Sequence, residues 1–244
     1  MGFNHSALIG FGGAGSAGLQ DSVFPQTRSS GTPVFTGVAS SVNCPYPATI
    51  SANDILFILT RVTDTLNLTS ATAAGFTEVN RTGGGGATSA VVLLWKRAVG
   101  SESGTLGVTI SGGGGGTQTV WAVMWSVKNC ITSGTPYAGN DTSTGGGPPG
   151  SDWVSNPFTT ATANSGGMHV VFQNNSTLTT IFGWTSPGNI GSEDPQITAS
   201  SSNSVWVDYF RCDTVGTYFT NTTTGATDAT IGAGKSFFSM ELLR

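Results

Sequence analysis

The chain has 244 residues, of which only 9% are charged, and 13 acidic against 9 basic residues give a formal net charge of −4. Binding to nucleic acid needs a clustered positive surface. No run of Lys or Arg occurs in this sequence, so we expect no nucleic-acid partner. No stretch approaches the roughly 18 consecutive apolar residues of a membrane-spanning helix, and we expect no membrane partner either.

The composition favours an all-β fold. Gly accounts for 36 residues, and Ser, Thr and Asn replace most of the usual Lys and Glu. Ser, Thr and Asn compete with the helical backbone for hydrogen bonds, and Gly adds an entropic cost to helix formation. Many short strands joined by tight turns are therefore predicted. The length fits one large domain or two small ones.

The first 33 residues differ from the rest. The stretch HSALIGFGGAGSAG is rich in Gly and carries apolar side chains with little polar cover. Either it is a disordered tail or it is an arm that folds onto a partner, and we favour the arm because disordered tails are usually depleted of apolar residues. The predicted partner-docking residues are Phe3, Leu8, Ile9 and Phe11.

Residues 34–130 predict a first β unit, organised around 51–62, SANDILFILTRV. A turn at Asn53 and Asp54 runs into an apolar stretch that is too short for a typical helix and apolar on both faces. This pattern predicts a strand buried on two sides. Further strands are predicted at 89–99 and 118–127.

Residues 131–156 are rich in Gly, Thr and Pro and lack periodicity, which indicates a linker. Residues 157–244 then repeat the order of the first unit as a second β unit. SVWVDYFRC at 204–212 echoes SAVVLLWKR at 89–97, and each of these strands closes beside an arginine. Strands are also expected at 168–172 and 236–243.

The three cysteines are far apart in the chain and form no C-x-x-C pair. Neither a zinc site nor a disulfide framework is therefore indicated. We expect buried free thiols, although one disulfide between Cys44 and Cys130 remains open. The third cysteine is Cys212.

No motif predicts a cofactor or a catalytic centre. The G-x-G-x-x-G pattern at 10–15 requires a following helix to hold a pyrophosphate, and Pro25 ends any such helix early. Only His5 and His169 could act as a general base, and His169 sits within an apolar strand pattern. The acidic residues show no calcium-loop spacing. We expect no enzyme activity, no cofactor and no metal.

Aromatic residues in loop-like sequence are candidates for ligand binding, because such side chains stack on sugars or anchor interfaces. For Trp184, in a Gly-Trp-Thr sequence that predicts a turn, the alternative is that its indole closes the end of a sandwich. The candidates are Tyr137, Trp153 and Trp184.

The repeated strand order resembles a known family. Asn53-Asp54-Ile55-Leu56 opens the first unit, Gly183-Trp184-Thr185 lies in the second, and aromatic strands close on Arg97 and Arg211. These features are similar to the repeated β-sandwich modules of tailed-phage virion proteins, such as head decoration, head fibre and tail fibre proteins. The resemblance implies no catalytic residue. Two repeated units of this size, with strands separated by turn signals, themselves predict tandem antiparallel, jelly-roll-like β-sandwiches, and residues 1–33 would form an extended N-terminal arm.

The leading hypothesis is a non-enzymatic structural protein of a phage particle, a surface decoration or fibre-type subunit attached through its arm. Its partners would be other virion proteins and sister subunits. No charged n-region precedes Arg28, so we expect synthesis in the host cytoplasm without a signal peptide. The alternative is an adhesin that binds host glycans, and a glycan-degrading enzyme ranks below both.

Overall fold

The computed structural model describes residues 24–36, 40–63, 70–82, 90–111, 119–145, 158–174, 182–185, 197–200, 203–223 and 235–244. All regular structure in these ranges is β-strand, and every strand pairing is antiparallel. The predicted all-β fold is confirmed. A search of the same ranges for helices able to span a membrane found none.

The first half of the chain contributes β1 (Gln26–Ser30), β2 (Val34–Thr36), β3 (Ser41–Pro45), β4 (Ile55–Thr63), β5 (Ser70–Ala73), β6 (Thr77–Thr82), β7 (Ala90–Arg97), β8 (Thr105–Ser111) and β9 (Thr119–Lys128). The second half contributes β10 (Tyr137–Gly145), β11 (Phe158–Thr159), β12 (Ser165–Asn174), β13 (Phe182–Thr185), β14 (Ile197–Ser200), β15 (Asn203–Cys212), β16 (Thr217–Thr223) and β17 (Lys235–Leu242). The strands predicted from apolar patterns correspond to β4, β7, β9, β12, β15 and β17.

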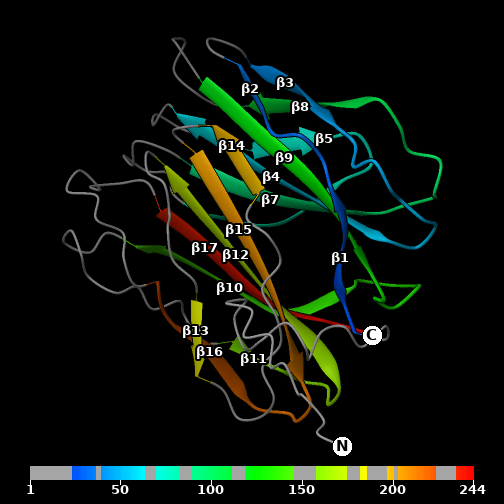
Figure 1. The fold of residues 1–244 in the computed structure, drawn as a ribbon. Coiled ribbons are helices and arrows are strands. Elements are labelled where there is room, and N and C mark those ends of the chain that lie inside the picture. The colour runs from blue at the N-terminus through cyan, green and yellow to red at the C-terminus, as the bar shows by residue number, and fades with distance from the viewer. Residues whose placement is uncertain are drawn as a thin grey trace, which may run out of the picture.

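The strands form four sheets, two from each half (Figure 1). The first large sheet has the order β1-β9-β4-β7-β6, with β2 also paired to β9, and the first small sheet has the order β3-β8-β5. The second large sheet has the order β10-β17-β12-β15-β14, and the second small sheet has the order β11-β16-β13. The second half therefore repeats the strand order of the first.

Strand β4 lies in the middle of the first large sheet, between β7 and β9. Ile55, Phe57 and Leu59 point to one face and Leu56 and Ile58 to the other, and all five are fully buried. Since alternate residues of a strand face opposite sides, both faces of this sheet must be covered. The prediction that this strand is buried on two sides is confirmed.

The turn before β4 is fixed by its own side chains. Asn53 has a positive φ of 71°, a conformation that Asn tolerates better than most residues. The buried carboxylate of Asp54 accepts a hydrogen bond from the Ser51 backbone N–H at 2.8 Å. It also pairs with the Arg28 guanidinium, with Nε–Oδ2 at 2.6 Å and Nη2–Oδ1 at 3.1 Å. The predicted turn is thus tied to β1.

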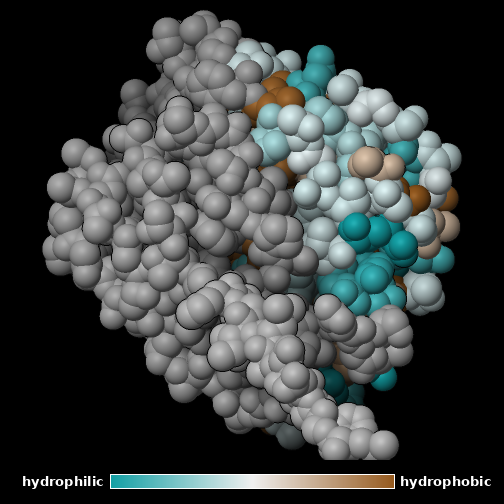
Figure 2. All heavy atoms as spheres, in the orientation of Figure 1, coloured by the Kyte–Doolittle hydropathy of each residue, from teal (hydrophilic) through white to brown (hydrophobic). Residues whose placement is uncertain are grey.

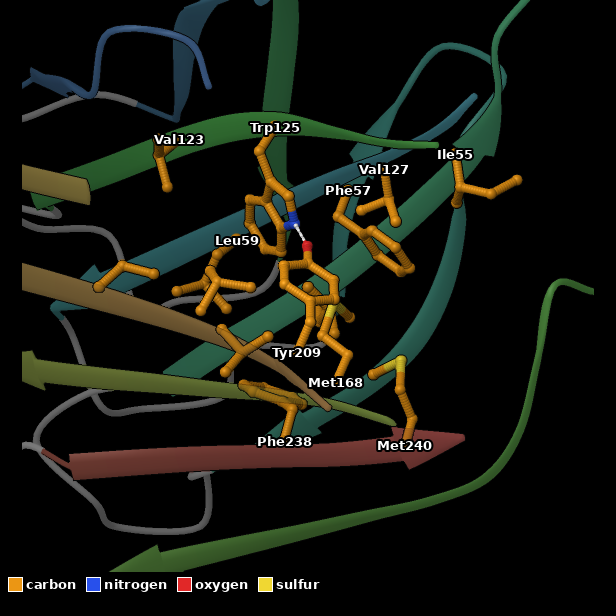
Figure 3. Packing of buried hydrophobic residues seen from close by; sticks show 14 of the residues in the cluster. Ile55, Phe57, Leu59, Val123, Trp125, Val127, Met168, Tyr209, Phe238 and Met240 are labelled. Carbon is orange, nitrogen blue, oxygen red and sulfur yellow. Dashed lines mark hydrogen bonds between the residues drawn. The ribbon is translucent and has the colours of Figure 1, made fainter. Parts of the chain in front are cut away.

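One hydrophobic core joins the two halves (Figure 3). Phe57 and Trp125 of the first large sheet stack at a centroid distance of 5.6 Å. They meet Tyr209 and Phe238 of the second large sheet, and Trp125 Nε1 donates a hydrogen bond to Tyr209 Oη at 3.0 Å. The large sheets therefore pack face to face. A second core, which includes Leu56 and other residues of the opposite face, joins the first large sheet to the first small sheet.

Two segments that were not expected to be strands belong to sheets. Tyr137–Gly145, within the predicted linker, forms β10 and pairs with β17. Gln26–Ser30, within the predicted arm, forms β1 and pairs with β9. Both are edge strands of their sheets. A strand at the edge of an antiparallel sheet can keep a polar composition. The sequences of β1 and β10 are polar and lack the apolar alternation from which a strand is predicted.

Candidate functional site

The point where residues 1–23 join the described body is held by a cluster that we call the Phe24 clamp: Phe24, Pro25, Asn129, Gly166, Arg211 and Arg244. The Phe24 ring is 2% exposed. The guanidinium carbon of Arg211 lies 4.3 Å from its centroid, and that of Arg244 lies 4.8 Å from it. A guanidinium this close to an aromatic face is attracted by the ring quadrupole.

Backbone contacts reinforce the clamp. Asn129 Nδ2 donates a hydrogen bond to the Phe24 carbonyl at 2.8 Å. Pro25 packs against Gly166 so closely that a Cβ at position 166 would lie 2.8 Å from Pro25 Cγ. Position 166 therefore has to lack a side chain for the chain to follow this path. The clamp draws on both halves of the protein and fixes the direction in which the chain enters β1.

Arg211 is itself held in place. Its Nε and Nη2 atoms both lie 3.1 Å from Oδ1 of Asp213. Both side chains are roughly a quarter exposed, so the pair contributes little to stability by itself. Its effect is to orient the guanidinium over Phe24.

None of the docking residues predicted from sequence lies in the described part of the chain. Phe3, Leu8, Ile9 and Phe11 lie outside the described residues, and so does Trp153. The docking arm therefore remains a prediction. What the structure adds is the anchor point of that segment, Phe24, which the sequence did not single out.

Two candidate ligand-binding aromatics lie within strands. Tyr137 is half-buried at the start of β10, and its ring packs edge-on against Trp95 at a centroid distance of 6.0 Å. The predicted turn at Gly183-Trp184-Thr185 is wrong, because these residues belong to β13, which pairs with β16. A role for these residues in glycan binding remains a prediction.

His169 lies in a buried polar layer on the side of the second large sheet that faces away from the shared core. Its Nδ1 lies 2.9 Å from Ser239 Oγ, and both side chains are buried. Burial lowers the pKa of His169 to about 3. The nearby Glu241 carboxylate, which is also buried, accepts hydrogen bonds from the backbone N–H groups of Ala161 and Thr162 at 2.8 and 3.0 Å.

This polar layer was missed in the sequence. Ser239 and Glu241 alternate with Phe238, Met240 and Leu242, which is the pattern of a strand with one face in water. The structure buries both faces instead. Without access to solvent, the His169–Ser239 pair is placed to specify packing, and a substrate could not reach it.

The cysteines are free and buried, as expected. The disulfide between Cys44 and Cys130 that the sequence left open is not formed. Burial raises the pKa of Cys44 and of Cys130 to about 12, and these thiols stay protonated at neutral pH. Among the described residues, no group of three or more His, Cys, Asp or Glu side chains is placed to hold a metal ion.

Comparison with known proteins adds no identity. No protein-family model matches the chain, and searches of curated proteins and of solved structures found no similar protein. Its function therefore has to be inferred from its own residues and their geometry.

Proposed function

We propose that this chain is a non-enzymatic structural subunit of a phage particle, of the surface decoration or fibre type, attached through its N-terminal segment. In this proposal each half is a jelly-roll-like β-sandwich, made of one large and one small sheet, and the tandem pair forms a rigid body. The observation that carries the proposal is the Phe24 clamp. It fixes Phe24, the residue that directly follows segment 1–23, to the body of the protein.

The described surface supports the division between body and tether. In the view of Figure 2 its atoms are mostly pale or hydrophilic, with hydrophobic atoms scattered among them. Among the described residues, Val99 and Val215 are the large hydrophobic side chains that are exposed. They are single residues, and a docking surface usually needs a contiguous apolar patch. The docking candidates of this proposal are therefore the apolar residues that the sequence predicts in segment 1–23.

The clamp also defines where a test deletion has to stop. Removal of residues 1–23 keeps Phe24 and the whole of β1, whereas a longer deletion would take away core contacts. We expect the shortened chain to fold with an unchanged melting temperature. In particles purified from cells that produce each chain, the full-length protein should be present and the shortened one absent.

A pair of point variants separates docking from folding. Ile9→Asp and Ser16→Asp each add one negative charge within residues 1–23, but only Ile9→Asp places it on a predicted docking residue. We expect Ile9→Asp to lower incorporation into particles at least tenfold and Ser16→Asp to leave it unchanged. Normal incorporation of the shortened chain, or failure of the full-length chain to copurify with particles, would overturn the proposal.

A further inference from the structure

The strands that build the shared core occupy the same positions in both halves. In the first large sheet they are β9, β4 and β7, and in the second they are β17, β12 and β15. Each trio is the middle of its sheet, and each buries the face that points toward the other half. The two contact surfaces are therefore the same part of a repeated fold.

Two arginines occupy equivalent places. Arg97 is the register partner of Ile55 near the end of β7, and Arg211 is the register partner of Gly166 near the end of β15. Arg97 donates hydrogen bonds to the carbonyls of Ile131 and Gly134, in the segment that leads into β10. Arg211 lies over Phe24, in the segment that leads into β1. Each arginine thus holds the segment that leads into the first strand of the opposite half.

The residues two positions before these arginines repeat the exchange. Trp95 packs against Tyr137, the first residue of β10. Tyr209 Oη accepts a hydrogen bond from Thr27 Oγ1 in β1 at 3.1 Å. By register, Tyr209 is the equivalent of Trp95, and Thr27 is the equivalent of Tyr137. The same pair of positions is therefore in contact twice, with the two halves exchanged, which is the signature of an isologous, two-fold interface.

We infer that the inner face of each large sheet is a self-complementary docking surface whose partner is a second half-unit of this chain. The chain is then an internal dimer with an approximate two-fold axis. Its two halves are held by this surface and do not depend on the covalent link between them. The inference does not rest on the proposed function and needs no particle for its test.

The equivalence also predicts how the halves could be reconnected. Nine residues separate Val127 in β9 from Tyr137 in β10. By register, Leu242 in β17 corresponds to Val127, and Thr27 in β1 corresponds to Tyr137. A link from the second half back to the first would therefore run from Leu242 to Thr27. The chain already supplies five of the nine residues that such a link needs, namely Leu243, Arg244 and the three residues from Phe24 to Gln26. About four added residues should therefore join Arg244 to Phe24 without strain.

The first experiment is cleavage of the link in the folded protein. Residues 132–135 are exposed, so a protease site inserted after Ser133 can be cut under native conditions. We expect the cut protein to keep its near-ultraviolet circular dichroism and its mass of about 25 kDa in light scattering at a concentration of about 1 μM, which corresponds to a binding free energy of about −8 kcal/mol. Separation of the halves at this concentration would overturn the inference.

Variants of the cut protein test the symmetry. Arg97→Ala and Arg211→Ala should each raise the dissociation constant of the cut halves about tenfold or more. Arg81→Ala is the matched control, because this arginine pairs with Glu78 in β6, outside the contacts described above. An equal effect of all three variants would refute the reciprocal clamps.

A circular permutant is an independent check. It begins after Ser133, runs to Arg244, continues through four added residues to Phe24 and ends at Ser133. We expect its melting temperature to match that of the linear chain 24–244 to within a few degrees. If the cut protein stays together but the permutant does not fold, the two-fold relation is refuted while the tight contact between the halves stands.

Discussion

Acidification should destabilise this protein through His169. Burial lowers the pKa of His169 to about 3 in the folded protein, whereas in the unfolded chain it has its ordinary value near 6.5. Between these values the unfolded chain binds a proton that the folded protein does not. The stabilising contribution of neutral His169 is therefore complete above pH 6.5 and is lost as the pH falls toward 3.

The expected magnitude follows from the same shift. Each pH unit within the window lowers the free energy of unfolding by about 1.4 kcal/mol, so acidification from pH 6.5 to 4 should remove about 3 kcal/mol. Ser239 Oγ lies 2.9 Å from the imidazole Nδ1, Glu241 follows two residues further along β17, and Asp208 is the backbone register partner of His169 in β15. His169→Gln removes the titrating group and keeps a side chain able to hydrogen-bond Ser239.

The assay is urea unfolding at pH 4, 5, 6 and 7, followed by tryptophan fluorescence and by far-ultraviolet circular dichroism. The difference in free energy of unfolding between wild type and His169→Gln should shrink by about 3 kcal/mol between pH 7 and pH 4. His5→Gln, a change at the other histidine, should keep the wild-type slope. Parallel pH profiles for wild type and His169→Gln would refute the assignment.

Two further variants test packing. Tyr209→Phe removes the acceptor of the Trp125 indole N–H and should lower the free energy of unfolding by about 1–3 kcal/mol, the cost of a buried donor without a partner; an unchanged urea midpoint would contradict this. Gly166→Ala places a Cβ 2.8 Å from Pro25 and should cost about 1–3 kcal/mol through overpacking. Gly107→Ala, where a Cβ meets no atom within 4 Å, is its control in a thermal melt, and equal melting temperatures would argue against a tight clamp.

The central strands could be predicted because their sequence is nearly incompatible with other environments. In β4, apolar residues on both faces require a sheet that is covered twice, and the structure shows this. The same reasoning failed for β1 and β10, which are polar in sequence and lie at the edges of their sheets. Edge position depends on the rest of the fold and leaves little trace in the strand itself.

The contacts of the candidate site were hidden for a different reason. Phe24 precedes a proline in a segment without periodicity, and its ring is enclosed by Arg211 and Arg244 from the far end of the chain. Residue spacing carries no signal for such distant contacts. Likewise, Glu241 shows the alternation of a solvent-facing position, but its carboxylate is buried and accepts hydrogen bonds from Ala161 and Thr162 in the segment after β11.

The two halves repeat one strand order but differ in what they bury on their outer sides. The first large sheet buries Leu56 and Ile58 against its small sheet, and the described residues on the corresponding side of the second include the buried polar side chains of His169, Ser239 and Glu241. The core between the two large sheets takes buried residues from the central strands of both halves. Neither half can keep this core without the other. We therefore predict that both halves unfold together, in one transition.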